Sequence, residues 1–281
     1  IGGGMSTTLK VINTSPTLST VAKVVFRDPV SSAEILDFLV YLSPNDVWTG
    51  TAKCLAVDAN SNCVKSEVRS SDDSQELVGS EVWGSPAVNA VVESSSDNGR
   101  VALPNQGYVD IEMGPTFLLA PNQAPKSGVT KDAVRKAYNE RINAGNTFVL
   151  STETPNILTG SVTADTHTEL GSAEIPLLAL ANYDTQYVPQ VGVASGLDVS
   201  IQRTPVADVE EAIWKNNIVV PYNTDAGSVS LATFTFPTKL AYNDRTDGQY
   251  NFGSRASVTA AYPTVCYVAD VFDTTEQTIV G

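Results

Sequence analysis

The sequence predicts an all-β fold: a jelly-roll-like β-sandwich with two short connecting α-helices. Two observations lead to this prediction. Runs of Val, Ile, Thr and Tyr, which favour strands, alternate with turn residues such as Gly, Pro, Asn and Asp. Only two segments combine helical periodicity with a helix-start signal. With 281 residues, the chain is long enough to form one large sandwich with its own core.

The first half of the chain indicates successive antiparallel strands. Apolar residues that alternate or run continuously predict strands at 8–13, 21–27, 34–42, 47–54 and 107–114. Between two of them, Ser43-Pro44-Asn45-Asp46 predicts a turn with proline in its second position. The Ser/Asp/Gly-rich stretch at about 66–100 predicts a long loop excursion with strand-like islands at 76–82 and 88–93.

The two helices are predicted at residues 130–142 and 204–214. Thr130 and Thr204 are suited to the N-cap position, and Pro205 stands where proline is favoured in the first turn. Further strands are expected at 217–222, 228–236, 256–261, 265–272 and 277–280. We interpret residues 1–281 as a single domain, with a split near 120–130 as the alternative.

The charge of the chain limits its partners. Lys and Arg total 17 against 31 Asp and Glu, which gives a net charge of −14. Nucleic-acid binding requires basic patches, so we expect none. No apolar run reaches the roughly 18–20 residues that a spanning helix needs, so no direct membrane insertion is expected. An acidic, Lys-poor surface is also typical of exported proteins.

The cysteines indicate an oxidising compartment. Cys54 and Cys63 flank the turn residues Asp58-Ala-Asn-Ser-Asn, so a hairpin would bring them together as a disulfide. Cys266 lies in an apolar run and is expected to be a buried thiol. The Asp58 turn has the D-x-N-x-N spacing of a calcium loop but lacks its glycine and glutamate. A plain turn is therefore favoured, with structural calcium as the alternative and no other cofactor expected.

Residues with catalytic potential are few, because the chain has a single histidine, His167. Asp110 and Glu112 share a strand face, as a glycosidase pair would, but the favoured interpretation is a solvent-facing polar stripe. Asp37 stands in an apolar run and is expected to form a buried hydrogen bond or ion pair, with Arg27 as the candidate partner.

Two further patterns suggest surface sites. Asn13-Thr14-Ser15 is a glycosylation-type sequon, which makes Asn13 a glycosylation candidate. The three tryptophans are candidates for a sugar-stacking platform, although core or interface positions are favoured for Trp48, Trp83 and Trp214.

Four segments resemble a family of uncharacterised secreted β-rich bacterial surface proteins: Ser32–Phe38 leading into Tyr41–Gly50, then Gly107–Gly114, Phe234–Lys239 and the opening Val11–Thr14. The resemblance implies export to the cell surface or medium, and it implies no catalytic residue. Members of that family have an extra strand before the segment that matches Val11–Thr14, where this chain has only residues 1–6. The opening Ile1-Gly-Gly-Gly before Met5 is expected to follow a cleaved signal peptide, with a cloning remnant as the alternative.

The lack of that extra strand suggests a function. The sheet would have an open edge, which a terminal strand of a neighbouring copy could fill, and repetition of this contact would build a filament. The chain is therefore expected to be a non-enzymatic extracellular structural protein whose partners are copies of itself. The expected joining strands lie within Gly2–Asn13 and Thr275–Gly281, through Leu9, Val11, Ile12, Asn13, Thr278, Ile279 and Val280.

Two other functions stay open. One is a monomeric or anchored carbohydrate-binding adhesin, and the other is a glycoside-type hydrolase that uses an Asp/Glu pair.

Overall fold

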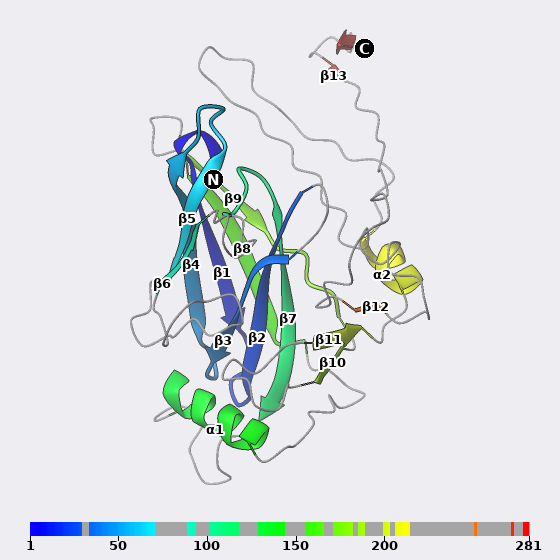
Figure 1. The fold of residues 1–281 in the computed structure, drawn as a ribbon. Coiled ribbons are helices and arrows are strands. Elements are labelled where there is room, and N and C mark those ends of the chain that lie inside the picture. The colour runs from blue at the N-terminus through cyan, green and yellow to red at the C-terminus, as the bar shows by residue number, and fades with distance from the viewer. Residues whose placement is uncertain are drawn as a thin grey trace.

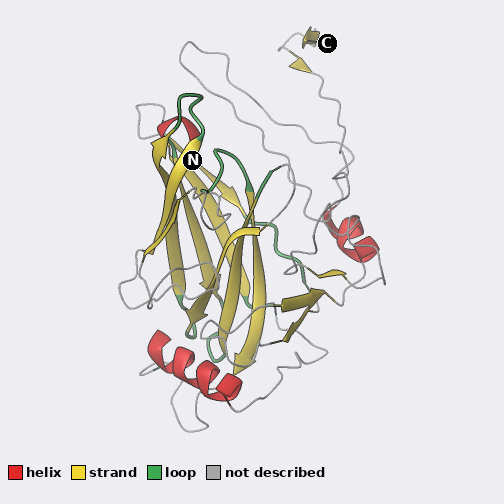
Figure 2. Cartoon of the chain, viewed as in Figure 1, coloured by secondary structure: helices red, strands yellow, loops and turns green. Residues whose placement is uncertain are grey.

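Antiparallel strands make up most of the described structure (Figure 2). The computed structural model describes residues 1–29, 34–70, 89–93, 102–117, 129–143, 156–165, 171–181, 185–188, 199–202, 206–213, 250–251, 271–272 and 278–280. Within these ranges the two α-helices are short, so the all-β prediction is confirmed.

The larger sheet has six strands in the spatial order β6-β5-β4-β1-β8-β9 (Figure 1). Each neighbouring pair is antiparallel. The strands are β1 (Ser6–Asn13), β4 (Val47–Val57), β5 (Cys63–Ser70), β6 (Asn89–Glu93), β8 (Leu158–Asp165) and β9 (Ser172–Pro176).

The second sheet has three strands in the order β3-β2-β7, again antiparallel. They are β2 (Ser19–Arg27), β3 (Glu34–Leu42) and β7 (Tyr108–Phe117). The strand predicted at 107–114 continues past Gly114-Pro115 to Phe117. The β2–β7 register shifts between Thr20 and Ala22, opposite this point. Proline is tolerated in an outer strand at such an irregularity.

The two sheets face each other across one apolar core. Alternate residues of each strand point to the same side, so each sheet has an apolar face that packs against the other. Phe38 of β3 and Trp48 of β4 meet in it with ring centroids 5.7 Å apart. The cluster comprises Leu9, Val11, Ala22, Val24, Leu36, Phe38, Val40, Leu42, Trp48, Ala52, Val68 and Leu103.

Helix α1 (Lys131–Asn143) packs on the three-stranded sheet at one end (Figure 1). The hydroxyl of Thr130 accepts a hydrogen bond from the Ala133 N–H at 3.2 Å, as expected for an N-cap residue. Tyr138 is buried and meets Tyr41 of β3 edge to face, with centroids 6.0 Å apart. Helix α2 (Val206–Ile213) also forms where the sequence predicts a helix.

The remaining elements are short. A 3-10 turn η1 (Gly2–Gly4) precedes β1. Strands β10 (Thr185–Val188), β11 (Val199–Gln202) and β12 (Tyr250–Asn251) form a small sheet. Strands β13 (Val271–Phe272) and β14 (Thr278–Val280) pair with each other. The strands predicted at 217–222, 228–236 and 256–261 lie outside the described residues.

The sheets bear on two predictions of chain organisation. The excursion predicted at 66–100 begins in the sheet, because β5 reaches Ser70, and the strand-like island predicted at 88–93 is confirmed as β6, which pairs with β5. Residues 71–88 and 94–100 are outside the described ranges. Strands β8 and β9 follow residue 130 yet extend the same sheet as β1 and β4. A domain boundary near 120–130 would cut that sheet in two.

Candidate functional site

Strand β1, which was expected to join subunits, is an interior strand of its own sheet. It pairs with β4 along one edge and with β8 along the other. Leu9 and Val11 are buried in the core, and Ile12 is partly buried on the other side of the strand. A subunit joint made from β1 would therefore require this strand to leave its own sheet.

Asn13 is fully buried at the end of β1, with 0% of its surface exposed. Its Nδ2 donates to the carbonyl oxygens of Leu18 at 2.8 Å and Ser43 at 2.9 Å, and its Oδ1 accepts from the Ser15 N–H at 3.0 Å. A glycan would have to occupy that same nitrogen. The glycosylation interpretation of Asn13 is therefore incompatible with this fold. The side chain instead links the loop after β1 to Ser43, and we call Asn13 with its three hydrogen bonds the Asn13 clip.

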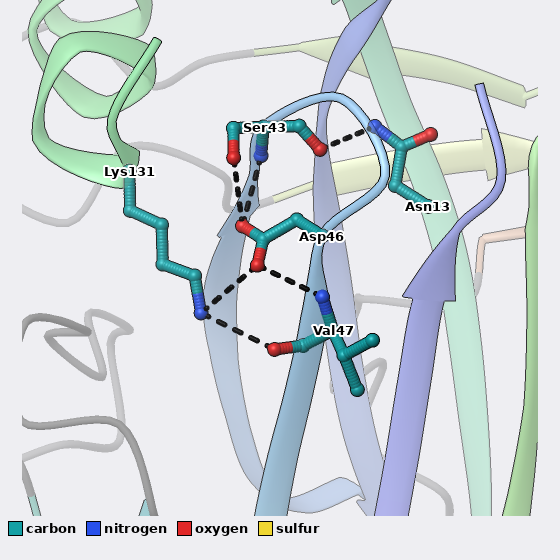
Figure 3. Close-up of polar contacts among 5 residues, drawn as sticks. All are labelled: Asn13, Ser43, Asp46, Val47 and Lys131. Carbon is teal, nitrogen blue, oxygen red and sulfur yellow. Dashed lines mark hydrogen bonds and ion pairs between the residues drawn. The ribbon is translucent and has the colours of Figure 1, made fainter. Parts of the chain in front are cut away.

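The turn between β3 and β4 connects the two sheets. Asp46 N–H donates to the Ser43 carbonyl at 3.2 Å, and Asn45 has a positive φ of 56°, as the third residue of a type II turn does. The predicted turn is confirmed. The Asn13 clip holds this turn through the same Ser43 carbonyl (Figure 3).

The Asp46 carboxylate fixes the turn and anchors helix α1 (Figure 3). Its Oδ2 accepts from the Ser43 N–H at 3.0 Å and the Ser43 hydroxyl at 3.1 Å, and its Oδ1 accepts from the Val47 N–H at 2.8 Å. Lys131 of α1 places Nζ 3.5 Å from Oδ1 and 3.4 Å from the Val47 carbonyl. This cluster joins a helix to a turn, which indicates a structural role.

The hairpin between β4 and β5 carries the predicted disulfide. Cys54 and Cys63 are bonded, with an S–S distance of 2.10 Å. At the tip, Asp58 Oδ1 accepts from the N–H groups of Asn60 at 2.9 Å and Asn62 at 2.8 Å. The hydrogen bonds from Asn62 lower the Asp58 pKa.

This carboxylate is therefore occupied by its own loop, as the favoured plain-turn interpretation requires. The described residues contain no group of three or more potential metal ligands.

The outer face of the three-stranded sheet carries buried charges. Arg27 of β2 forms an ion pair with Asp110 of β7. Glu112 is only 6% exposed, and the register places it opposite Lys23, which is also buried. Burial alone would lower the Arg27 pKa, but the negative charges of Asp110 and Glu112 outweigh it and raise the pKa above its ordinary value.

One prediction about these charges is corrected by the structure. Asp110 and Glu112 were expected to face solvent, but Glu112 is buried and Asp110 is held by a buried guanidinium. The predicted contact of Asp37 with Arg27 stays a prediction, because the Asp37 side chain lies outside the described part. The arrangement supports a charge cluster that holds β2 to β7.

The favoured core position is confirmed for Trp48, because its side chain is fully buried, and the alternative of a sugar-stacking platform does not apply to it. The other candidates, Trp83 and Trp214, lie outside the described residues, as do His167 and Cys266.

Among the residues that the structure describes, the larger sheet ends at β9, which gives it an open edge there. Within the described part of the chain β9 pairs only with β8, and all five of its residues are exposed. Leu177, just after β9, donates its N–H to the Gly160 carbonyl of β8 at 3.0 Å. Because main-chain groups alternate in an antiparallel ladder, those of Ser172, Glu174 and Pro176 point away from β8. Proline has no N–H, so Ser172 and Glu174 supply the outward donors.

The two faces of β9 differ in chemistry. Ile175 stands opposite Val162, which packs against the core, yet Ile175 is 50% exposed. Leu178, two residues after the strand, is 65% exposed. On the other face, the Glu174 carboxylate lies 3.0 Å from Lys10 Nζ and 2.5 Å from the Ser161 hydroxyl. The Ser161 hydrogen bond and the Lys10 charge lower the Glu174 pKa. The one charged side chain of β9 is thus already paired.

Sequence reasoning missed β9. The segment does carry a weak signal, because the small or apolar Ala173 and Ile175 alternate with the polar Ser172 and Glu174. The strand is only five residues long and ends in proline, so a sequence of this kind is equally typical of a loop.

One carboxylate on the larger sheet gives the fold an acid-sensitive contribution. Glu67 of β5 is buried, 2.9 Å from Lys53 Nζ of β4, and the contact with Lys53 lowers its pKa. A lowered folded-state pKa stabilises the fold above the unfolded value of about 4.3, and this contribution is lost as the pH falls through the folded-state pKa.

We expect Glu67→Gln to lower the free energy of unfolding by about 1 kcal/mol at pH 7. Urea titrations should show that this difference shrinks near pH 3, and a difference independent of pH would contradict the assignment.

Comparison with family models, curated proteins and solved structures found no match. The resemblance of four segments between residues 11 and 239 to secreted surface proteins therefore stays a prediction. Neither described helix is long and apolar enough to cross a membrane.

Proposed function

We propose that this chain is a non-enzymatic extracellular structural protein that assembles with copies of itself through β-strand complementation. The open edge of β9 is the observation that carries the proposal. An edge strand with unpaired main-chain groups is a template for a strand of another chain. Ser172 and Glu174 offer N–H donors there, and Ile175 offers apolar surface beside the core.

The short length of β9 favours specific pairing over indiscriminate aggregation. Pro176 supplies a carbonyl but no donor, so the edge ends at this residue. A strand that docks there gains hydrogen bonds from a short stretch only, and it must also cover Ile175 with an apolar side chain of its own. Both requirements restrict which segments fit.

An extracellular location is supported by the Cys54–Cys63 disulfide, since disulfides persist in oxidising compartments. The acidic composition and the resemblance to secreted surface proteins agree with it. We also propose that the sandwich is of the jelly-roll type. The nested pairing of β2 with β7 inside that of β1 with β8 supports this topology.

The proposal predicts that the Glu174→Pro variant assembles only at a higher concentration than the wild type. Proline removes the outward N–H and cannot pair with an incoming strand, while the bonds between β9 and β8 use other residues. One lost main-chain hydrogen bond is worth about 1.4 kcal/mol, so we expect the concentration needed for assembly to rise about tenfold. Light scattering across a concentration series, with negative-stain electron microscopy, measures it.

Glu174→Ala is the matched control. Both variants lose the carboxylate contacts with Lys10 and Ser161, but only proline removes the outward N–H. Glu174→Ala should therefore assemble as the wild type does. Equal assembly by Glu174→Pro would overturn the proposal for this edge, and a wild-type chain that stays monomeric at every concentration would favour the adhesin alternative.

A further inference from the structure

We infer that the strand that docks on β9 is the C-terminal strand β14 of the next copy, so that the contact is head to tail. This inference rests on the proposed function and identifies the donor segment. Two terminal strands were expected to serve as donors, β1 and the segment that contains β14. The structure distinguishes between them.

The positions of the two strands favour β14. β1 is paired on both edges and lies in the interior of the larger sheet. β14 (Thr278–Val280) pairs with the two-residue strand β13, and Figure 1 shows this pair apart from both sheets. Withdrawal of β14 from β13 breaks a short, irregular pairing, whereas withdrawal of β1 would dismantle the core around Leu9 and Val11.

The charges also favour β14. Each copy carries a net charge of −14, so two copies repel each other, and a contact that buried an unpaired charge would add a further cost. Thr278, Ile279 and Val280 are uncharged. On the acceptor, Glu174 is already paired with Lys10. Docking of β14 on β9 therefore buries no new uncompensated charge.

Apolar complementarity supplies the third argument. Ile175 is half exposed on the face of β9 that continues the core. In a strand paired with β9, the residue opposite Ile175 lies on the same face and covers it. β14 offers Ile279 for that position, and its neighbours Thr278 and Val280 are β-branched, a residue type that favours strands.

The contact uses two different surfaces, β9 on one copy and β14 on the next. Such a heterologous contact continues into an open filament unless its rotation closes a ring. The inference therefore predicts linear polymers with one free β9 edge at one end and one free β14 strand at the other.

The test compares the full chain with a chain that ends at Gln277. We expect the truncated chain to keep its circular dichroism spectrum and to stay monomeric at concentrations about tenfold above those at which the full chain assembles. In the full-length background, Ile279→Asp should have the same effect and Thr278→Ala should not. Assembly by the truncated chain or by Ile279→Asp at the wild-type concentration would overturn the inference.

A peptide separates this inference from the proposed function. The synthetic peptide Thr-Glu-Gln-Thr-Ile-Val-Gly, which has the sequence of residues 275–281, should bind the truncated chain and cap full-length polymers. A scrambled peptide is the control, and Glu174→Pro in the truncated chain should weaken binding about tenfold. If the truncated chain assembles while Glu174→Pro blocks assembly, the edge proposal stands and β14 is not the donor. If Glu174→Pro changes neither assembly nor peptide binding, both the proposal for the β9 edge and the inference for β14 are wrong.

Discussion

Replacement of Asn13 by alanine is expected to lower the free energy of unfolding by about 4 kcal/mol. The buried amide makes three hydrogen bonds, to the carbonyls of Leu18 and Ser43 and from the N–H of Ser15. Alanine removes the amide partner of the Leu18 carbonyl and of the Ser15 N–H, at about 1–3 kcal/mol each, while the Ser43 carbonyl keeps its hydrogen bond from the Asp46 N–H. Urea unfolding followed by circular dichroism measures the loss.

Thr17→Ala is the control, because Thr17 lies on the surface of the same loop. Its effect should stay within about 0.5 kcal/mol. A loss below about 1 kcal/mol for Asn13→Ala would contradict the clip, since it would mean that water satisfies the freed groups. Expression in a glycosylating host supplies a second readout, because the folded protein should carry no glycan mass at Asn13.

Replacement of Gly50 by alanine is expected to cost about 3 kcal/mol. Gly50 is buried in β4, and a Cβ there would lie 2.2 Å from a ring carbon of Trp48. The ring is not free to move aside, because it is fully buried and packs against Phe38. The same urea titration measures this loss, and Thr51→Ala, on the opposite face of β4, should cost about 1 kcal/mol or less.

A double-mutant cycle identifies the cause of the Gly50 effect. Phenylalanine at position 48 has a smaller ring system that lacks the Trp48 ring carbons next to the new Cβ. It also removes an indole N–H that has no hydrogen-bond partner in the described structure. Gly50→Ala should therefore cost at least about 1 kcal/mol less in the Trp48→Phe background than in the wild type. Additive effects would show that the clash with Trp48 is not the reason.

Local sequence patterns correctly predicted strands β1 to β4 and both helices. Glu34–Leu42 is a strand because nine mostly apolar residues lie between Asp28-Pro29 and Ser43-Pro44, and α1 begins where Thr130 caps it. The Cys54–Cys63 disulfide followed from a turn of fixed length between two strand-like runs. In each case the information lies within about ten residues of the element.

The candidate site depends on partners that are distant in the sequence, so local patterns did not reveal it. Leu158–Asp165 is composed mostly of small and polar residues and becomes a strand because β1 lies beside it. β9 is a strand only because β8 precedes it. The same limit applies to Arg27, because its ion pair with Asp110 depends on the pairing of β2 with β7, which local patterns do not reveal. Asn13 matched a surface motif, and only the approach of Ser43 reveals that it is buried.

Hydrogen–deuterium exchange on assembled protein tests the central claim most directly. The amides of Ser172 and Glu174 point away from β8, so they should exchange rapidly in the monomer. The account predicts that both become protected in the assembled protein, while exposed amides of the Asp58 turn, such as that of Asn60, keep their rates. Unchanged exchange at Ser172 and Glu174 in a fully assembled sample would contradict it, because the copies would then be joined elsewhere.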